Sequence, residues 1–185
     1  MKIIDLDPNN EAILHQMAAM LVEAFQEHWP LAWPTLDDAL EEVQEALQAD
    51  NINRVAVDEE GRVLGWIGGI NQYDGHAWEL HPLVVRPDQQ GQGIGQALVA
   101  DFEERVCERG GLTVYLGSDD EDNMTSLAAI ELYPNVLDHL ARIKNLRCHP
   151  FEFYQKQGYT IVGVIPDANG WGKPDIMLAK RVGEK

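Results

Sequence analysis

The sequence is poor in cysteine, in basic residues and in long apolar segments, and each shortage excludes a class of protein. Its two cysteines among 185 residues, Cys107 and Cys148, lack the spacing of a metal site. We therefore expect reduced thiols and no metal. No apolar run approaches the roughly 20 residues that a membrane span needs, and the acidic N-terminus lacks a signal-peptide core. We expect a cytoplasmic protein that does not bind membranes.

Acidic residues outnumber basic ones, 31 to 14, and the formal net charge is −17. Nucleic acid is excluded as a partner, because its phosphates require a basic surface. A negative potential instead attracts polycationic substrates. On charge alone, acidity that serves only solubility fits equally well.

The order of predicted elements indicates one α/β domain over residues 1–185, of which 45% are hydrophobic. Hairpins and crossovers both occur, so the sheet should be mixed. Thr35 resembles a helix N-cap, and Pro134 and Pro150 interrupt the last helical region. The predicted strands are 2–6, 52–57, 62–71, 77–85, 112–116, 159–165 and 175–180, and the predicted helices are 11–25, 36–49, 94–109 and, with interruptions, 124–157.

The central stretch is the strand 77–85, which leads through a glycine-rich turn at 90–95 into the helix 94–109. The N–H groups of a first helical turn have no intrahelical partner, and the helix dipole adds positive charge there. Glycines let a phosphate approach this backbone closely, so the turn can bind a pyrophosphate without lysine. The spacing fits neither a Walker loop nor the dinucleotide fingerprint. A tight turn without a ligand is the plain alternative.

Two motifs resemble the GNAT superfamily of N-acetyltransferases. Gln90, Gly93 and Gly95 match its Gln/Arg-x-x-Gly-x-Gly/Ala loop, which holds the pyrophosphate of acetyl-coenzyme A. Tyr154, followed by Gly158 and Tyr159, matches a second signature, whose tyrosine protonates the departing thiolate of coenzyme A or hydrogen-bonds its sulfur. The resemblance implies a mixed, mostly antiparallel sheet that is splayed at the central strand and flanked by helices. It also implies a cofactor site made of Leu83, Val84, Val85, Gln90, Gly91, Gln92, Gly93, Ile94, Gly95, Gln96 and Tyr154.

Three residues of the central strand are candidates for the chemistry. Alternation in a strand predicts that Glu79, His81 and Leu83 share one face. Pro82 cannot donate a ladder hydrogen bond, so pairing should be disturbed there. The N–H of Leu83 can then stabilise an oxyanion on a thioester carbonyl. Glu79, about 13 Å upstream, should act through water or bind the substrate ammonium, and His81 is a second candidate proton acceptor. A surface carboxylate and a packed histidine are the plain alternatives.

A narrower resemblance covers nearly the whole chain, including the insertion between Asn123 and Tyr154. Segments 78–85, 110–117, 145–154 and 161–176 look like the aminoglycoside 6'-N-acetyltransferases of the enterococcal chromosomal type. The resemblance implies acetyl transfer to the 6'-amino group of an aminoglycoside, a role in antibiotic resistance and a homodimer. It also implies a substrate site formed by Phe25, where that type has tryptophan, and by Trp29, Glu79, Asp119, Asp120 and Asp122.

Neither cysteine is placed as an acyl carrier, which favours direct attack by the amine in a ternary complex over a ping-pong route. Two other functions remain open. One is acetyl transfer to another amine, such as a polyamine or a protein N-terminus. The other is a non-catalytic module that senses acetyl-coenzyme A, although the joint presence of Glu79, His81 and Tyr154 favours an enzyme.

Overall fold

The computed structural model describes residues 1–183, which fold into two compact units. Unit 1 contains residues 1–114 with 182 and 183, and unit 2 contains residues 115–181. The strand order is β1-β2-β3-β4-β5-β7-β6. β1 to β4 pair in antiparallel succession, and β6 pairs antiparallel with β7. The predicted α/β fold, with a mostly antiparallel sheet flanked by helices, is confirmed. That the two units act as one domain stays a prediction.

Unit 1 follows the predicted order of elements closely. Glu11 to Phe25 form a helix, as the apolar period indicates, and Thr35 caps the next helix in a capping box with Asp38. That helix ends at Ala46, three residues before its predicted end. The elements are β1 (Lys2–Asp5), α1 (Glu11–Phe25), α2 (Leu36–Ala46), β2 (Ile52–Val57), β3 (Val63–Gln72), the short turn η1 (Tyr73–Gly75), β4 (Ala77–Val85), the short turn η2 (Pro87–Gln89) and α3 (Ile94–Glu108).

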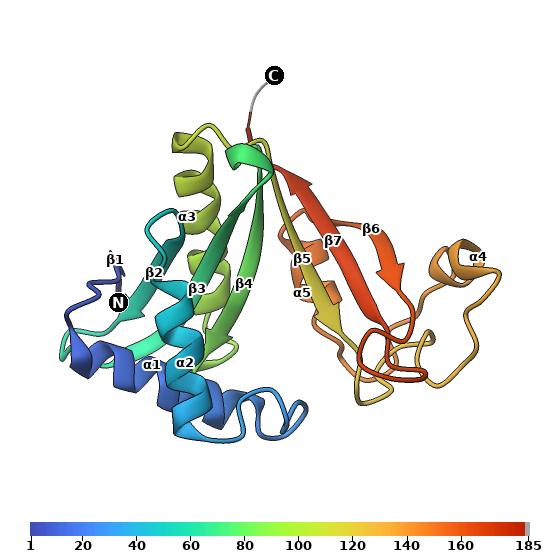
Figure 1. Cartoon of the computed structure of the whole chain (residues 1–185), viewed down its shortest axis with the longest axis horizontal. Helices are drawn as coiled ribbons and strands as arrows, with labels where there is room; N and C mark the ends of the chain where they lie inside the picture. The colour runs from blue at the N-terminus through green and yellow to red at the C-terminus, as the bar shows by residue number, and fades with distance from the viewer. Residues whose placement is uncertain (184–185) are drawn as a thin grey trace. The chain divides into compact units, whose positions relative to one another are not determined.

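Helices cover both faces of the β1–β4 sheet (Figure 1). Trp66 of β3 is fully buried in a core that α1 and α2 form on one face. Its neighbours in the strand point the other way, toward α3. A Cβ on Gly65 would lie 3.0 Å from Leu98, and one on Gly69 would overlap the ring of Phe102. The absence of side chains at these glycines therefore lets α3 pack close to the sheet.

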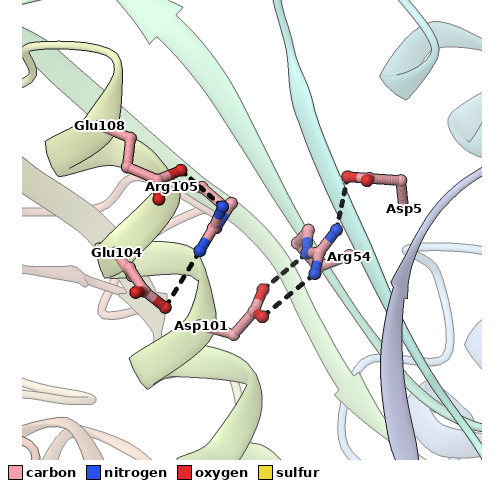
Figure 2. A network of polar contacts seen from close by, with 6 residues as sticks. All are labelled: Asp5, Arg54, Asp101, Glu104, Arg105 and Glu108. Carbon is pink, nitrogen blue, oxygen red and sulfur yellow. Dashed lines mark hydrogen bonds and ion pairs between the residues drawn. The ribbon is translucent and has the colours of Figure 1, made fainter.

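An arginine at the centre of unit 1 ties β1, β2 and α3 together (Figure 2). Arg54 of β2 has a side chain that is only 10% exposed, and it donates two hydrogen bonds to Asp101 of α3, at 2.6 and 3.1 Å. It also donates to Asp5 of β1. The hydrogen bond to Asp101 is the main cause that raises the pKa of Arg54. A buried charge that is paired in this way holds the sheet and the helix in a fixed relation.

Unit 2 contains the end of β5 (Thr113–Asp119) together with α4 (Val136–Leu140), α5 (Phe151–Lys156), β6 (Thr160–Ile165) and β7 (Asp175–Arg181). The strand β5 extends three residues beyond its predicted end and includes Gly117, where a side chain would collide with the carboxylate of Asp175. The unit buries Leu116, Leu127, Phe151, Ile176 and Leu178.

The predicted helical region 124–157 is largely wrong. Only the short helices α4 and α5 form there, and the remaining residues make turns held by specific hydrogen bonds. Thr125 and Asn145 form an isolated antiparallel bridge, and the N–H of Leu146 donates to the carbonyl oxygen of Met124 at 2.8 Å. These contacts use the backbone groups that a continuous helix would need. Pro134 stands just before the start of α4, and Pro150 just before the start of α5, so both helices begin after a proline.

Candidate active site

The ladder between β3 and β4 is broken beside Pro82. Ile67 pairs with Leu83, but Gly69 pairs with Leu80, so β4 contains one residue more than β3 in this interval. Such an arrangement is a β-bulge, a feature often found next to active sites. A Cβ on Gly68 would lie 2.3 Å from the carbonyl oxygen of His81, so glycine is required opposite the bulge. The predicted disturbance of pairing at Pro82 is confirmed.

The bulge also corrects the predicted arrangement of the three strand residues. Glu79 pairs with Ile70, and His81 lies next to α2. Leu83 pairs with Ile67, which alternates with Trp66 and therefore points toward α3. The prediction that Leu83 shares a face with Glu79 and His81 is wrong, because one extra residue in a strand turns all later side chains over. The chemistry predicted for Leu83 involves its backbone N–H. That role does not depend on the face of the sheet that its side chain occupies.

His81 lies beside a carboxylate that the sequence did not link to it. Its Nε2 is 3.5 Å from Oε1 of Glu42 on α2, while Oε2 of Glu42 accepts a hydrogen bond of 3.3 Å from Nε1 of Trp33. The pKa of Glu42 is lowered, chiefly by the contact with His81. The side chains of Glu42 and His81 are 20% and 46% exposed. No spacing in the sequence indicates a contact between residues 39 positions apart.

The aromatic residues before α2 form one cluster. The ring of Phe25 lies 5.6 Å from the ring of Trp29 and packs edge-on against Trp33, with centroids 4.7 Å apart. The ring of Trp33 in turn lies 6.3 Å from the imidazole of His81. Phe25 and Trp29, both predicted to bind substrate, are thereby connected to the β4 residues through Trp33, which was not among the predicted site residues.

A cavity of about 260 Å³ opens between the end of α2 and the β3–β4 ladder of unit 1. Glu42, Glu45 and His81 line it, together with Asn51 and Asn53. The two carboxylates make this cavity suitable for cationic groups.

The glycine-rich turn has an open backbone. Gly91 and Gly93 have φ angles of 74° and 85°, in the left-handed region that favours glycine, and no protein atom lies within 4 Å of the position a Cβ would occupy at either residue. Gln90 fastens the turn, because its Nε2 donates to the carbonyl oxygen of Val85 at 3.2 Å. Gly93 is the N-cap of α3 and provides no side-chain cap.

These features fit a pyrophosphate. The first turn of α3 contains no acidic residue, although the chain as a whole is strongly acidic. Its N–H groups and the helix dipole therefore provide a local positive end for an anion. The direct contacts of Arg86 lie elsewhere: its guanidinium donates to the carbonyl oxygen of Val63 at 2.8 Å and lies 3.4 Å from Glu23.

In unit 2, Tyr154 lies on the short helix α5 and is 9% exposed. Its ring packs against those of Phe153 and Tyr159, with centroids 5.1 and 5.7 Å away. Burial raises the pKa of the Tyr154 phenol well above its usual range. The hydroxyl is therefore protonated at neutral pH, as a proton donor requires.

The three aspartates predicted to bind substrate differ in their surroundings. Asp120 is completely buried, and its carboxylate accepts hydrogen bonds from the N–H groups of Met124 and Thr125 at 2.7 and 2.8 Å. Asp119 is half-buried and accepts a hydrogen bond from Asn169, whereas Asp122 is exposed. Asp120 thus anchors the loop that follows β5. Asp122 is the aspartate of the three that faces solvent.

Several negative findings apply to residues 1–183. The structure there groups no three His, Cys, Asp or Glu side chains that could hold a metal ion. None of its helices combines the length and apolar character that crossing a bilayer demands. Cys107 and Cys148 are both free thiols and both exposed.

Comparison with known proteins identifies the family. Residues 14–134, more than half of the chain, match the model of the Acetyltransferase (GNAT) family. This chain belongs to the GNAT family of acetyltransferases. Curated GNAT relatives match over a shorter stretch: an acetyltransferase of Yersinia pestis (strain Pestoides F) is 30% identical over 84 residues. That match covers 45% of the chain and 57% of the relative, so the chain spans little more than half the length of such relatives.

Solved structures of GNAT enzymes match over the entire chain. An aminoglycoside 6'-N-acetyltransferase complexed with coenzyme A is 43% identical, with a TM-score of 0.90, and the match covers 100% of this chain and 99% of that one. The aminoglycoside 6'-N-acetyltransferase from Enterococcus faecium has the same identity and coverage and a TM-score of 0.88. An aminoglycoside 6'-acetyltransferase of type Ii is 37% identical at a TM-score of 0.74, with the same coverage.

Proposed function

We propose that this GNAT enzyme transfers an acetyl group from acetyl-coenzyme A to the 6'-amino group of an aminoglycoside, by direct attack in a ternary complex. The observation that carries the proposal is the full-length likeness, at 43% identity, to an aminoglycoside 6'-N-acetyltransferase complexed with coenzyme A. The open glycine turn and the bulged strand β4 support it independently, because an open backbone suits a pyrophosphate and the bulge interrupts the β3–β4 ladder beside Leu83.

The turn from Gln90 to Gln96 would hold the pyrophosphate through its N–H groups, beside the strand residues 83–85. Acetyl-coenzyme A supplies the acetyl group as a thioester. The N–H of Leu83 would stabilise the negative charge that develops on the carbonyl oxygen during attack. Tyr154, whose phenol is protonated at neutral pH, would give its proton to the departing sulfur.

The substrate side requires a proton acceptor. An acidic environment binds an ammonium group but raises its pKa, which opposes the deprotonation that attack requires. Glu79 and His81 would supply the acceptor, directly or through water. Phe25 and Trp29 would contact the rim of the substrate, and Asp119 and Asp122 would attract its other ammonium groups. Asp120 would hold the loop that carries them.

A thiol-release assay with purified enzyme and acetyl-coenzyme A tests the proposal. We expect turnover with kanamycin-type aminoglycosides that carry a 6'-amino group, and none with analogues that carry a hydroxyl group at that position. Spermidine and a short peptide serve as alternative amines. Turnover confined to either of these amines, or equal turnover with the 6'-hydroxyl analogue, would refute the assignment. Light scattering on the same sample tests the homodimer that we also propose.

A further inference from the structure

We infer that Glu42 is a positioning residue that holds the His81 imidazole in the tautomer able to take a proton from the attacking amine. The inference rests on the proposed function, and it assigns a role to a residue of α2 that lies outside the acetyltransferase motifs. It also selects His81, rather than Glu79, as the proton acceptor.

The first argument is geometric. Oε1 of Glu42 lies 3.5 Å from Nε2 of His81, and a carboxylate can only accept a hydrogen bond. The ring nitrogen that faces this carboxylate, Nε2, therefore carries the hydrogen. A neutral imidazole has only one such hydrogen, so Nδ1 has none. Nδ1 is then the nitrogen that can take a proton. The nitrogen lone pair of the amine forms the new C–N bond, and the thioester C–S bond breaks with its electron pair left on sulfur. The N–H proton passes to Nδ1, and the resulting imidazolium is paired with Glu42.

The second argument is that the carboxylate is itself held in place. Trp33 donates to the second oxygen of Glu42 at 3.3 Å, which leaves Oε1 for His81. The helix that bears Glu42 is fixed at its N-terminus by the Thr35–Asp38 capping box. Glu42 is also less exposed than His81, so water weakens this contact less than it weakens a surface ion pair.

The third argument comes from electrostatics. The contact with His81 is the first cause of the lowered pKa of Glu42, and it outweighs the opposing effect of burial. The carboxylate therefore stays ionised at neutral pH. An ionised carboxylate beside an imidazole fixes the tautomer and stabilises the imidazolium, as in other proton relays.

A double-mutant cycle tests the assignment, with Glu41→Gln as the matched control. Glu41 stands next to Glu42 on the same helix and has the same charge, but it is exposed and does not line the cavity that Glu42 and His81 line. We expect Glu42→Gln to lower kcat about tenfold, with KM for the aminoglycoside and Kd for coenzyme A within about twofold, and Glu41→Gln to leave kcat unchanged. In a His81→Ala background, Glu42→Gln should have no further effect on kcat. Additive losses would overturn the inference, because a purely structural role does not require His81.

The nitrogen-15 chemical shifts of the His81 imidazole provide a readout that needs no turnover. We expect the tautomer with hydrogen on Nε2 to dominate in the wild-type enzyme and in Glu41→Gln, and to lose population in Glu42→Gln. The same tautomer populations in all three proteins would overturn the inference. If the wild-type enzyme acetylates a different amine, the cycle is run with that amine. If it acetylates none, the proposed function fails, and the nitrogen-15 shifts alone decide whether Glu42 orients His81.

Discussion

Replacing Gly93 by alanine separates the proposed ligand-binding role of the glycine turn from its role in folding. Gly93 has a φ of 85°, and no protein atom lies within 4 Å of the position of a new Cβ. A methyl group therefore collides with nothing in the protein, and only backbone strain reduces stability. The left-handed conformation costs a residue with a side chain about 1–2 kcal/mol. For a chain of this size, that corresponds to a decrease in Tm of about 2–8 °C.

The effect on coenzyme A binding should be larger than this strain alone explains. The methyl group occupies the open space beside the N–H groups at the start of α3, which is where we propose that the pyrophosphate binds. Loss of one hydrogen bond to a charged group costs about 1.5–3 kcal/mol. The Kd for coenzyme A should therefore rise roughly 10- to 100-fold. Isothermal titration calorimetry on folded Gly93→Ala protein, well below its Tm, measures this change directly.

Gly61 provides the matched control. It has a φ of 82°, lies in the turn between β2 and β3, and likewise has no protein atom within 4 Å of a new Cβ. Gly61→Ala should lower the Tm by a similar amount and leave the Kd for coenzyme A unchanged. An unchanged Kd in Gly93→Ala, or equal weakening in both variants, would refute the assignment of the phosphate site to this turn.

Three further predictions concern other parts of the chain. Tyr154→Phe keeps the buried ring but removes the acidic hydrogen, so kcat should fall about 100-fold with little change in the Kd for coenzyme A; unchanged turnover would exclude Tyr154 as the acid. Asp101→Ala removes both oxygens that accept from the buried Arg54 and should lower the free energy of unfolding by about 3 kcal/mol, measured by urea denaturation; a loss below about 0.5 kcal/mol, usual for surface changes, would contradict it. Burial is the main cause that lowers the pKa of His149 below 6.5, so on acidification the unfolded chain gains a proton first, and stability falls as the pH drops below about 6.5. His149→Gln should therefore lose less stability between pH 7 and pH 5, by up to about 1.4 kcal/mol per pH unit, and identical pH dependence in both proteins would contradict this cause.

Local sequence signals were sufficient for those helices and strands whose bounds depend only on residues close by in the chain. The apolar period of residues 11–25 and the alternation and flanking turns of residues 77–85 predicted α1 and β4 with the bounds that the structure has. The Thr35 cap was predicted because a capping box needs only residues within one turn. The glycine spacing at 90–95 likewise predicted the open turn before α3.

Predictions failed where contacts between distant segments decide the structure. In residues 124–157, the buried Asp120 and the Thr125–Asn145 bridge take up backbone groups that helical periodicity alone would assign to a helix. The side of the sheet that Leu83 faces depends on a bulge opposite Gly68, which involves the neighbouring strand as well as β4.

The sequence by itself determined the family, the order of elements in unit 1 and the position of the glycine-rich turn before α3, because each depends on short-range patterns of glycine, apolar and capping residues. The tertiary structure alone decided which carboxylate faces His81, which aspartate is buried and which face of the sheet each β4 residue occupies. These outcomes depend on packing and strand register, which bring together residues that no local period relates.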